Sequence, residues 1–315
     1  MKVSLITTVL NADGHVGRFL ETVAAQTRPP DEVVVVDGGS TDGTLEELRA
    51  AVGITLVEEP GANIARGRNV AIVAATHDVI AVSDADCVLE PDWLERLLVP
   101  IEAGADVAMG AYRPLAENFL HRCMAAVNLP DPNEWDEATF MPSGRSVAFR
   151  REAIEAAGGY PEWLGIGEDM FVNHRWRELG MDMRLARDAV AWWRLRPDLR
   201  STWTQYFRYA RGDAIAGMHP ERHALRFAVY GGALYALGSR GTLRKLAALA
   251  GAGAYVAGPL RRASTWFDDP PERARAVAAI PALMAFVDTA KMAGYVAGLA
   301  VRRRSGGHRE HPPSP

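Results

Sequence analysis

Two aspartates, Asp84 and Asp86, stand two residues apart directly after the apolar run of residues 79–82. Such a run is typical of a short buried strand, and side chains two apart in an extended segment point the same way. Two carboxylates that share one small volume repel each other unless a cation lies between them, and oxygen ligands suit Mg²⁺ or Mn²⁺. Because Mg²⁺ is usually held by one or two carboxylates plus substrate phosphates, the pair predicts a metal site completed by a nucleotide diphosphate. These residues alone also fit an Asp-rich turn in which Asp84 caps the next element.

The chain before this pair alternates between strand and helix signals. Strand-like runs cover residues 3–8, 32–36, 54–57 and 79–82, and helical patterns cover residues 15–26, 45–50 and 64–75. The run 32–36 is apolar on both faces, which implies a sheet covered on both sides. The alternation predicts an α/β fold with a doubly wound, mainly parallel sheet. Open sheets of this kind bind ligands at the carboxyl ends of their strands, where Asp84 and Asp86 fall.

Composition sets broad limits. The 315 residues are 48% apolar and 23% charged, which is ordinary for a globular protein. Two cysteines, Cys87 and Cys123, provide neither a disulfide framework nor metal-ligand spacing, so a reducing compartment is expected. The N-terminus runs straight into a strand-like segment and lacks the apolar core of a signal peptide.

Charge is distributed unevenly along the chain. Residues 221–315 carry 14 Lys+Arg and 6 Asp+Glu, whereas the other 220 residues carry 21 and 33. An acidic body with a basic, Ala-rich tail predicts contact with an anionic surface, either membrane or nucleic acid. Few aromatic residues lie between the arginines, so we expect no nucleic-acid partner.

Three apolar segments follow residue 220, at residues 227–238, 246–260 and 276–301. A membrane span needs about 20 apolar residues, and the second segment is too short. The third carries Pro281, Asp288 and Lys291, and charges are costly at mid-bilayer. We expect helices that lie on, or hairpin into, the cytoplasmic leaflet beside anionic lipid. The alternative is a soluble helical subdomain or a dimer interface.

Several short motifs then occur in the order in which a known enzyme family carries them. They are residues 3–11, the turn at 36–44, Gly67-Arg68-Asn69, Ser83-Asp84-Ala85-Asp86 and Gly167-Glu168-Asp169. Over roughly residues 1–212, the chain resembles family 2 glycosyltransferases with the GT-A nucleotide-sugar-binding fold. The likeness is strongest to exopolysaccharide or cell-envelope members with basic, apolar C-terminal regions. Gly38 departs from the pattern, since many members carry a second aspartate there.

The resemblance implies a division of the chain and a set of donor contacts. Residues 1–220 would form the catalytic domain, 221–303 a helical and possibly membrane-associated region, and 304–315 a disordered tail. Thr8 and Asp37 match positions that contact the nucleotide base, and Arg68 matches a basic residue near the base and diphosphate. Asp84 would meet the ribose or the metal, and Asp86 would ligate Mn²⁺ or Mg²⁺ directly. The alternatives are a turn-forming Asp37 and a solvated Arg68 on a helix surface.

The resemblance also implies catalytic and acceptor-side residues. Asp169 would take the proton from an acceptor hydroxyl, with Glu168 orienting the acceptor or the base. Both could instead simply cap a helix. Residues 205–209 resemble the family's Q-x-x-R-W element with Tyr in place of Trp, followed by Arg211. The residues implied to hold the diphosphate and the acceptor sugar are Gln205, Arg208, Tyr209 and Arg211. Gln205, Arg208 and Tyr209 fall within about one helical turn, so we expect them to share a face. A plain amphipathic helix is the alternative.

The function predicted from the resemblance is inverting, metal-dependent transfer of a sugar from a nucleotide diphosphate sugar, with UDP favoured. The acceptor would be a lipid-linked glycan, a polyprenyl phosphate or a polysaccharide, on the inner face of the cell membrane. A processive polysaccharide synthase is the alternative within the class. A nucleotidyltransferase and a non-catalytic membrane-surface adaptor are the alternatives outside it.

Overall fold

The computed structural model describes residues 1–129 and 134–304. The chain divides into two compact units. We call Met1–Leu115 with Pro132–Arg194 the sheet unit, and Ala116–Asp131 with Leu195–Pro315 the helical unit. The division lies earlier than the predicted boundary at residue 220, because α8 packs with the C-terminal helices. The predicted tail overlaps α11 at Arg304, and residues 305–315 lie outside the described part of the chain.

The sheet unit is built on one mixed sheet with the strand order β3-β2-β1-β4-β7-β6-β8-β5. Strands β3, β2, β1 and β4 are mutually parallel, and β7 pairs antiparallel with β4 and β6. The strands are β1 (Val3–Val9), β2 (Glu32–Asp37), β3 (Thr55–Glu58), β4 (Val79–Val82), β5 (Cys87–Leu89), β6 (Val107–Leu115), β7 (Val147–Arg150) and β8 (Met183–Arg194). The predicted mainly parallel α/β sheet is confirmed.

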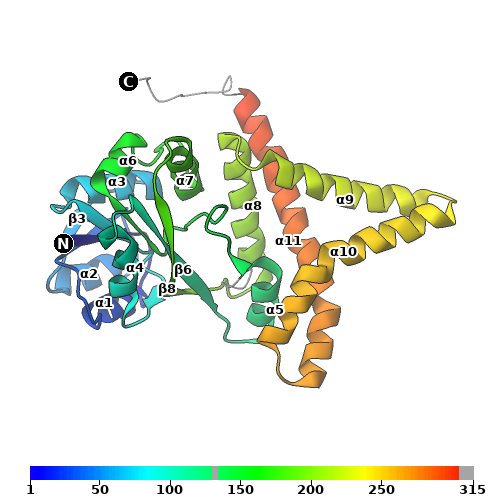
Figure 1. Ribbon diagram of the computed structural model, residues 1–315, viewed down its shortest axis with the longest axis horizontal. Helices are drawn as coiled ribbons and strands as arrows, with labels where there is room; N and C mark the ends of the chain where they lie inside the picture. The colour runs from blue at the N-terminus through cyan, green and yellow to red at the C-terminus, as the bar shows by residue number, and fades with distance from the viewer. Residues whose placement is uncertain (130–133, 305–315) are drawn as a thin grey trace. The chain divides into compact units, whose positions relative to one another are not determined.

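Helices pack around this sheet (Figure 1). They are α1 (Val16–Ala24), α2 (Thr44–Ala50), α3 (Ile64–Ala74), α4 (Trp93–Glu102), α6 (Arg151–Ala156) and α7 (Glu168–Glu178). Helix α3 begins after Asn63, because the Asn63 side chain accepts a hydrogen bond from the Arg66 N–H and so caps the helix. The first four strands and three helices lie close to their predicted bounds.

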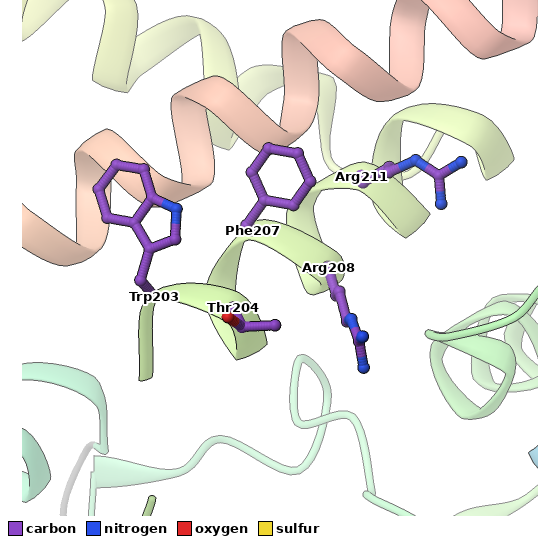
Figure 2. A pocket seen from close by; sticks show the side chains of 5 residues that line it. All are labelled: Trp203, Thr204, Phe207, Arg208 and Arg211. Carbon is purple, nitrogen blue, oxygen red and sulfur yellow. The ribbon is translucent and has the colours of Figure 1, made fainter. Parts of the chain in front are cut away.

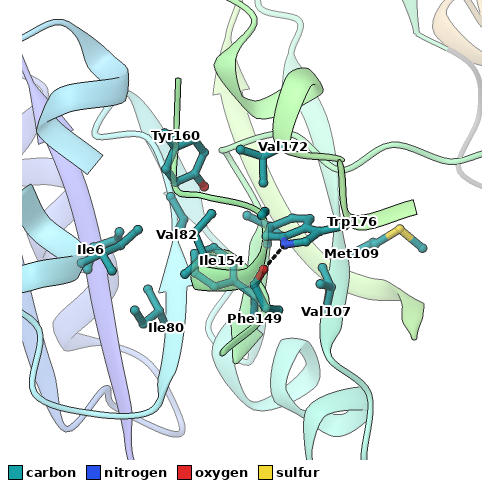
Figure 3. Close-up of a cluster of buried hydrophobic side chains, with 14 of the residues drawn as sticks. Ile6, Ile80, Val82, Val107, Met109, Phe149, Ile154, Tyr160, Val172 and Trp176 are labelled. Atoms are coloured by element: carbon teal, nitrogen blue, oxygen red, sulfur yellow. Dashed lines mark hydrogen bonds between the residues drawn. The ribbon is translucent and has the colours of Figure 1, made fainter. Parts of the chain in front are cut away.

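The core of the sheet unit lies between the sheet and its helices (Figure 3). All four residues of β4 are buried, as the apolar run predicted. The Phe149 and Trp176 rings meet with centroids 5.3 Å apart, and the Trp176 indole N–H donates to the Ala153 carbonyl at 2.9 Å. Replacing either ring with Ala would cost about 3–5 kcal/mol of stability. This core fixes the strand ends from which the site is built.

The helical unit contains α5 (Phe119–Asn128), α8 (Leu199–Ala216), α9 (Pro220–Gly238), α10 (Thr242–Trp266) and α11 (Pro270–Arg304). Helices α8 and α11 approach closely at Gly294 and Gly298. A Cβ at these glycines would lie 2.1 Å from the Phe207 carbonyl oxygen and 2.4 Å from that of Arg211. Among the described helices only α11 is long and apolar enough to cross a membrane, and 28% of its apolar window is buried. Helices α9 and α10 form a hairpin (Figure 1).

Candidate functional site

Three candidate residues lie at the carboxyl edge of the parallel strands. Val9, next to Thr8, pairs with Asp37 across β1 and β2, and Ile6 pairs with Val82 at the end of β4. Neighbouring parallel strands end at the same edge, so the fold brings Thr8, Asp37 and Asp84 to one side of the sheet.

Asp37 organises the turn that follows β2. Its Oδ1 accepts hydrogen bonds from the Gly39 and Ser40 N–H groups, each at 2.9 Å, and its Oδ2 accepts one from the Ser40 hydroxyl at 2.5 Å. The side chain is buried. Asp37 therefore forms the turn, as the alternative expected. A contact with a nucleotide base would have to be made by the same carboxylate.

Asp84 and Asp86 lie in a tight turn and not in an extended segment. Strand β4 ends at Val82, and the Cys87 N–H donates to the Asp84 carbonyl at 3.0 Å as the chain turns into β5. The geometric argument from extended chain is therefore wrong, because a turn separates the two carboxylates. The residues themselves stay candidates, since both side chains are only half-buried.

Arg68 of α3 is the centre of the site. Its side chain is 2% exposed, so the alternative of a solvated surface arginine is wrong. One guanidinium nitrogen, Nη2, lies 2.8 Å from Asp84 Oδ1, and the other, Nη1, lies 2.5 Å from Glu168 Oε1. We call these three residues the Arg68 centre. A guanidinium fork suits two carboxylates at once, and here it joins the turn after β4 to the start of α7.

Backbone from a third segment completes the Arg68 centre. A Cβ at Gly144 would lie 2.1 Å from Arg68 Nη2, so only glycine lets the chain pass this close to the guanidinium. The Gly144 N–H donates to Asp169 Oδ2 at 3.2 Å. The loop before β7 thus contacts both the arginine and the predicted catalytic aspartate.

Glu168 and Asp169 begin α7. Gly167 precedes them with φ of 86°, a left-handed conformation that favours glycine. Glu168 is buried against Arg68, whereas Asp169 is half-buried, and its Oδ1 also accepts from the Met170 N–H at 2.8 Å. Both carboxylates lie where the helix dipole stabilises negative charge. Asp169 is the more accessible of the pair, and Glu168 is held in place by Arg68.

Burial and charge shift the pKa values here. Burial raises the pKa of Glu168 to about 7, although Arg68 opposes the shift, and neighbouring Asp169 adds to it. Burial alone would lower the pKa of Arg68, but Glu168 and Asp84 raise it overall, so the arginine stays charged. Burial also raises the pKa of Tyr160, whose ring lies 5.3 Å from the Arg68 guanidinium carbon.

Arg145 is a site residue that the sequence did not single out. Its guanidinium stacks 4.4 Å from the Trp193 ring centroid, and its Nε lies 3.9 Å from Asp84 Oδ2. Stacking holds the side chain in place beside the candidate metal ligand. The sequence around Arg145 does not indicate that it belongs to the site, because its partners lie elsewhere in the chain, in β8 and in the turn after β4.

In the helical unit, α8 carries the four predicted acceptor-side residues. Arg208 and Arg211 line a hollow of about 390 Å³ together with Trp203, Thr204 and Phe207 (Figure 2). Gln205 instead donates to the Tyr209 hydroxyl at 2.9 Å, one helical turn away. Positions 205, 208 and 209 lie within one helical turn on neighbouring parts of the surface of α8, but Gln205 is buried whereas Arg208 is exposed at the hollow. A joint role for the four residues stays a prediction.

Comparison with known proteins decides the family. Residues 4–157 match the model of the family described as Glycosyl transferase family 2. This domain belongs to glycosyltransferase family 2. The transferase is similar to Haloferax volcanii glycosyltransferase AglE, 28% identical over 62% of this chain and 67% of that protein. It is also similar to the O-antigen chain rhamnosyltransferase RfbN of Salmonella typhimurium, 26% identical over 60% of this chain and 65% of that protein. The succinoglycan biosynthesis protein ExoA of Rhizobium meliloti is 27% identical over 67% of this chain and 68% of that protein.

Solved structures confirm the GT-A fold. Mannosyltransferase PcManGT from Pyrobaculum calidifontis, in complex with GDP-Man and Mn²⁺, has a TM-score of 0.56 at 23% identity, covering 96% of this chain and 87% of that one. TarS residues 1–349 from S. aureus, in complex with UDP-GlcNAc, have a TM-score of 0.52 at 16% identity, covering 97% and 92%. The transferase therefore has the GT-A architecture and resembles enzymes of envelope and exopolysaccharide biosynthesis.

The carboxylates at the carboxyl edge of the sheet fit a metal ion that has few protein ligands. Within residues 1–129 and 134–304, no three His, Cys, Asp or Glu side chains gather as a metal site. Asp84 is already ion-paired with Arg68. A metal ion here would therefore have at most two protein ligands, Asp84 and Asp86. Mg²⁺ and Mn²⁺ tolerate this small number when phosphate oxygens and water supply the rest.

Proposed function

We propose that this transferase moves a sugar from a nucleotide diphosphate sugar to a lipid-linked or glycan acceptor, with inversion and with a divalent metal. The observation that carries the proposal is the Arg68 centre, since one buried guanidinium ties Asp84 to the start of α7, where Asp169 lies. In a single displacement the leaving diphosphate and the proton acceptor act in the same step, so the residues for both roles have to be positioned together, as the Arg68 centre positions Asp84 and the start of α7.

In this proposal the donor occupies the carboxyl edge of the sheet. Thr8 and Asp37 contact the base, and a carboxylate that accepts the imide N–H of uracil favours UDP. Asp84 and Asp86 hold Mn²⁺ or Mg²⁺, which supplies charge neutralisation to the leaving diphosphate. Arg145 adds a positive charge beside Asp84, in reach of diphosphate oxygens.

Asp169 acts as the general base of the proposed reaction. The acceptor hydroxyl gives its proton to the Asp169 carboxylate, and the hydroxyl oxygen bonds to the anomeric carbon. The bond from that carbon to the diphosphate oxygen breaks on the opposite face, so the configuration inverts. Gly144 N–H orients the Asp169 carboxylate, and Arg68 keeps Glu168 beside it.

The acceptor class follows from the relatives and from the helical unit. RfbN is named for O-antigen chain rhamnosyl transfer and ExoA for succinoglycan biosynthesis, and both names favour a glycan acceptor. The hollow on α8 offers two guanidinium groups and two aromatic rings, which suit a phosphate next to an apolar or sugar surface. Gln205 and Tyr209 then support this helix face from behind. A site on the inner face of the cell membrane suits such an acceptor.

Nucleotide release tests the proposal. We would offer UDP-, GDP- and dTDP-sugars with Mn²⁺, Mg²⁺ or EDTA, with and without a membrane lipid extract. We expect metal-dependent release from one donor, lost in Asp86→Ala and Asp169→Asn. The matched control is Asp188→Asn, whose side chain is 79% exposed. The proposal fails if no donor is turned over, or if Asp86→Ala and Asp169→Asn both behave like the control.

A further inference from the structure

The most exposed apolar surface of the helical unit lies at the end of the α9–α10 hairpin. Leu234, Tyr235 and Leu237 of α9 are 71%, 66% and 72% exposed, and Leu243 and Leu249 of α10 are 80% and 70% exposed. We call these five residues the hairpin tip. Single exposed apolar side chains are normal on proteins, but a group of this size at one end of a hairpin marks an interaction surface.

The hairpin is also strongly basic. Between Glu221 and Asp268 the sequence has no acidic residue at all. It has seven basic ones: Arg222, Arg226, Arg240, Arg244, Lys245, Arg261 and Arg262. Arg240 lies in the turn between the two helices, and Arg244 and Lys245 lie in the first turn of α10, close in sequence to the apolar tip. An apolar surface ringed by positive charge is complementary to an anionic, amphipathic partner.

The other end of the hairpin is fixed to α11 by a buried polar cluster. Asp288 of α11 receives Arg226 Nε at 3.0 Å, the Tyr230 hydroxyl at 3.1 Å and the Tyr255 hydroxyl at 2.9 Å. Arg226 and Tyr230 belong to α9, and Tyr255 belongs to α10. We call these four residues the Asp288 centre. The hairpin therefore has an anchored base and an uncovered tip.

We propose that the hairpin tip inserts into the interface of an anionic lipid bilayer. This inference rests on the membrane-linked acceptor of the proposed function and names the segment that reaches the lipid. Neither α9 nor α10 qualifies as a membrane span, so the apolar residues enter the headgroup region without crossing. Tyr235, with an apolar ring and a polar hydroxyl, suits that depth. A second copy of the chain fits less well, because the same basic surface would face itself.

Vesicle flotation tests the inference. We would use vesicles of phosphatidylcholine alone and of phosphatidylcholine mixed with phosphatidylglycerol. We expect binding to the anionic vesicles, weakened by salt and reduced roughly tenfold or more in Leu237→Ser/Leu243→Ser. Arg244→Gln/Lys245→Gln should lose roughly tenfold as well. The matched control is Val52→Ser/Val73→Ser on the sheet unit, two side chains 97% and 83% exposed.

A second readout places the tip in the lipid directly. An environment-sensitive dye on Leu237→Cys should shift to the blue with anionic vesicles, and the same dye on Val52→Cys should not. Both native cysteines are buried. Equal binding by tip variants and control overturns the inference, as does a tip variant that changes a dimer into a monomer while vesicle binding is kept. All tip variants should keep metal-dependent nucleotide release in the absence of lipid. If the wild type itself shows no such release, the result counts against the proposed function and not against this inference.

Discussion

Each unit of the transferase contains a buried charged group with several partners, Arg68 in the sheet unit and Asp288 in the helical unit, and the two are opposite in sign. In the sheet unit, the Arg68 cation serves two carboxylates, those of Asp84 and Glu168, with Asp169 close by through Gly144. In the helical unit, the Asp288 anion is served by one cation and two hydroxyls. Both arrangements satisfy the rule that a buried charge needs partners.

The two clusters differ in the balance of their charges and in how far their carboxylates are exposed. Around Asp288 both carboxylate oxygens have hydrogen-bond donors, the negative charge is matched by the Arg226 guanidinium with Lys291 nearby, and the side chain is only 6% exposed. Around Arg68 the carboxylates outnumber the arginine, and the Asp84 side chain is 26% exposed. Surplus negative charge that reaches the surface can hold a metal and a diphosphate, whereas a balanced and closed cluster can only hold helices together. Balance and exposure, more than burial, therefore separate a ligand site from a structural one.

The largest expected effect comes from removing the cation. Arg68→Met leaves two carboxylates without their partner, so we expect a loss of about 3–5 kcal/mol in the sheet unit, together with loss of nucleotide release. Hydrogen exchange of sheet-unit peptides measures the first and the release assay the second. Arg66→Met on the same helix, with an exposed ion pair to Glu59, is the control and should change little. Equal effects of the two variants would remove the basis for the comparison.

Removing the anion of the helical unit should cost stability alone. In Asp288→Asn, Arg226 loses its charged partner while part of the hydrogen bonding remains, so we expect a loss of about 2–3 kcal/mol. Hydrogen exchange should rise in α9, α10 and α11, and nucleotide binding by the sheet unit should stay as in the wild type. The exposed Asp268→Asn serves as control. Lost nucleotide binding in Asp288→Asn would break the distinction between a structural and a functional centre.

Gly144→Ala tests the close passage of the loop against Arg68. The new Cβ would overlap the guanidinium, so we expect a cost of about 1–3 kcal/mol and a drop in nucleotide release through displacement of Arg68. Gly165→Ala is the matched control, because a Cβ there meets nothing within 4 Å. If both substitutions are tolerated alike in urea unfolding and release, Gly144 does not shape the centre.

The smallest expected effect is a dependence of stability on pH. The folded-state pKa of Glu168, about 7, lies above the ordinary value of 4.5, so between these values the folded state holds a proton that the unfolded chain has lost. This contribution is complete at low pH and is lost as pH rises through about 7. We expect sheet-unit stability to fall by about 1–2 kcal/mol between roughly pH 5.5 and 7.5. Glu168→Gln should abolish that slope, and a slope unchanged in this variant would place the titrating group elsewhere.

The sequence predicted the elements well because β-branched runs and turn residues encode them locally. The runs at 32–36 and 79–82 became buried strands on either side of β1 in one sheet, as their composition predicted. The family motifs likewise located the strand ends and the start of α7. Whether each motif residue takes the role that the resemblance implies remains a prediction.

What the sequence did not predict depends on contacts between distant segments. The sequence left a solvated surface arginine open as the alternative for Arg68, because its partners, Asp84 and Glu168, lie 16 and 100 residues further along the chain. The turn at Asp84 and the hollow that Arg208 and Arg211 line needed atomic geometry. The two compact units differ from the predicted division because α8 packs with the helices after residue 220, and because α5, which belongs to the helical unit, is encoded between two strands of the sheet.

That placement of α5 has a consequence for how the protein is made. Cys123 and Ala126 of α5 are covered by Phe267 and Ile280, and Met124 is covered by Tyr206 and Val287. During synthesis α5 leaves the ribosome while most of its covering residues are still untranslated. Its apolar side therefore stays exposed to water, or bound to a chaperone, until the last helices have been synthesised. A shortened chain that ends after α8 would keep every strand of the sheet yet expose α5 permanently, so aggregation of such a truncation would reflect a missing cover and not a misfolded sheet.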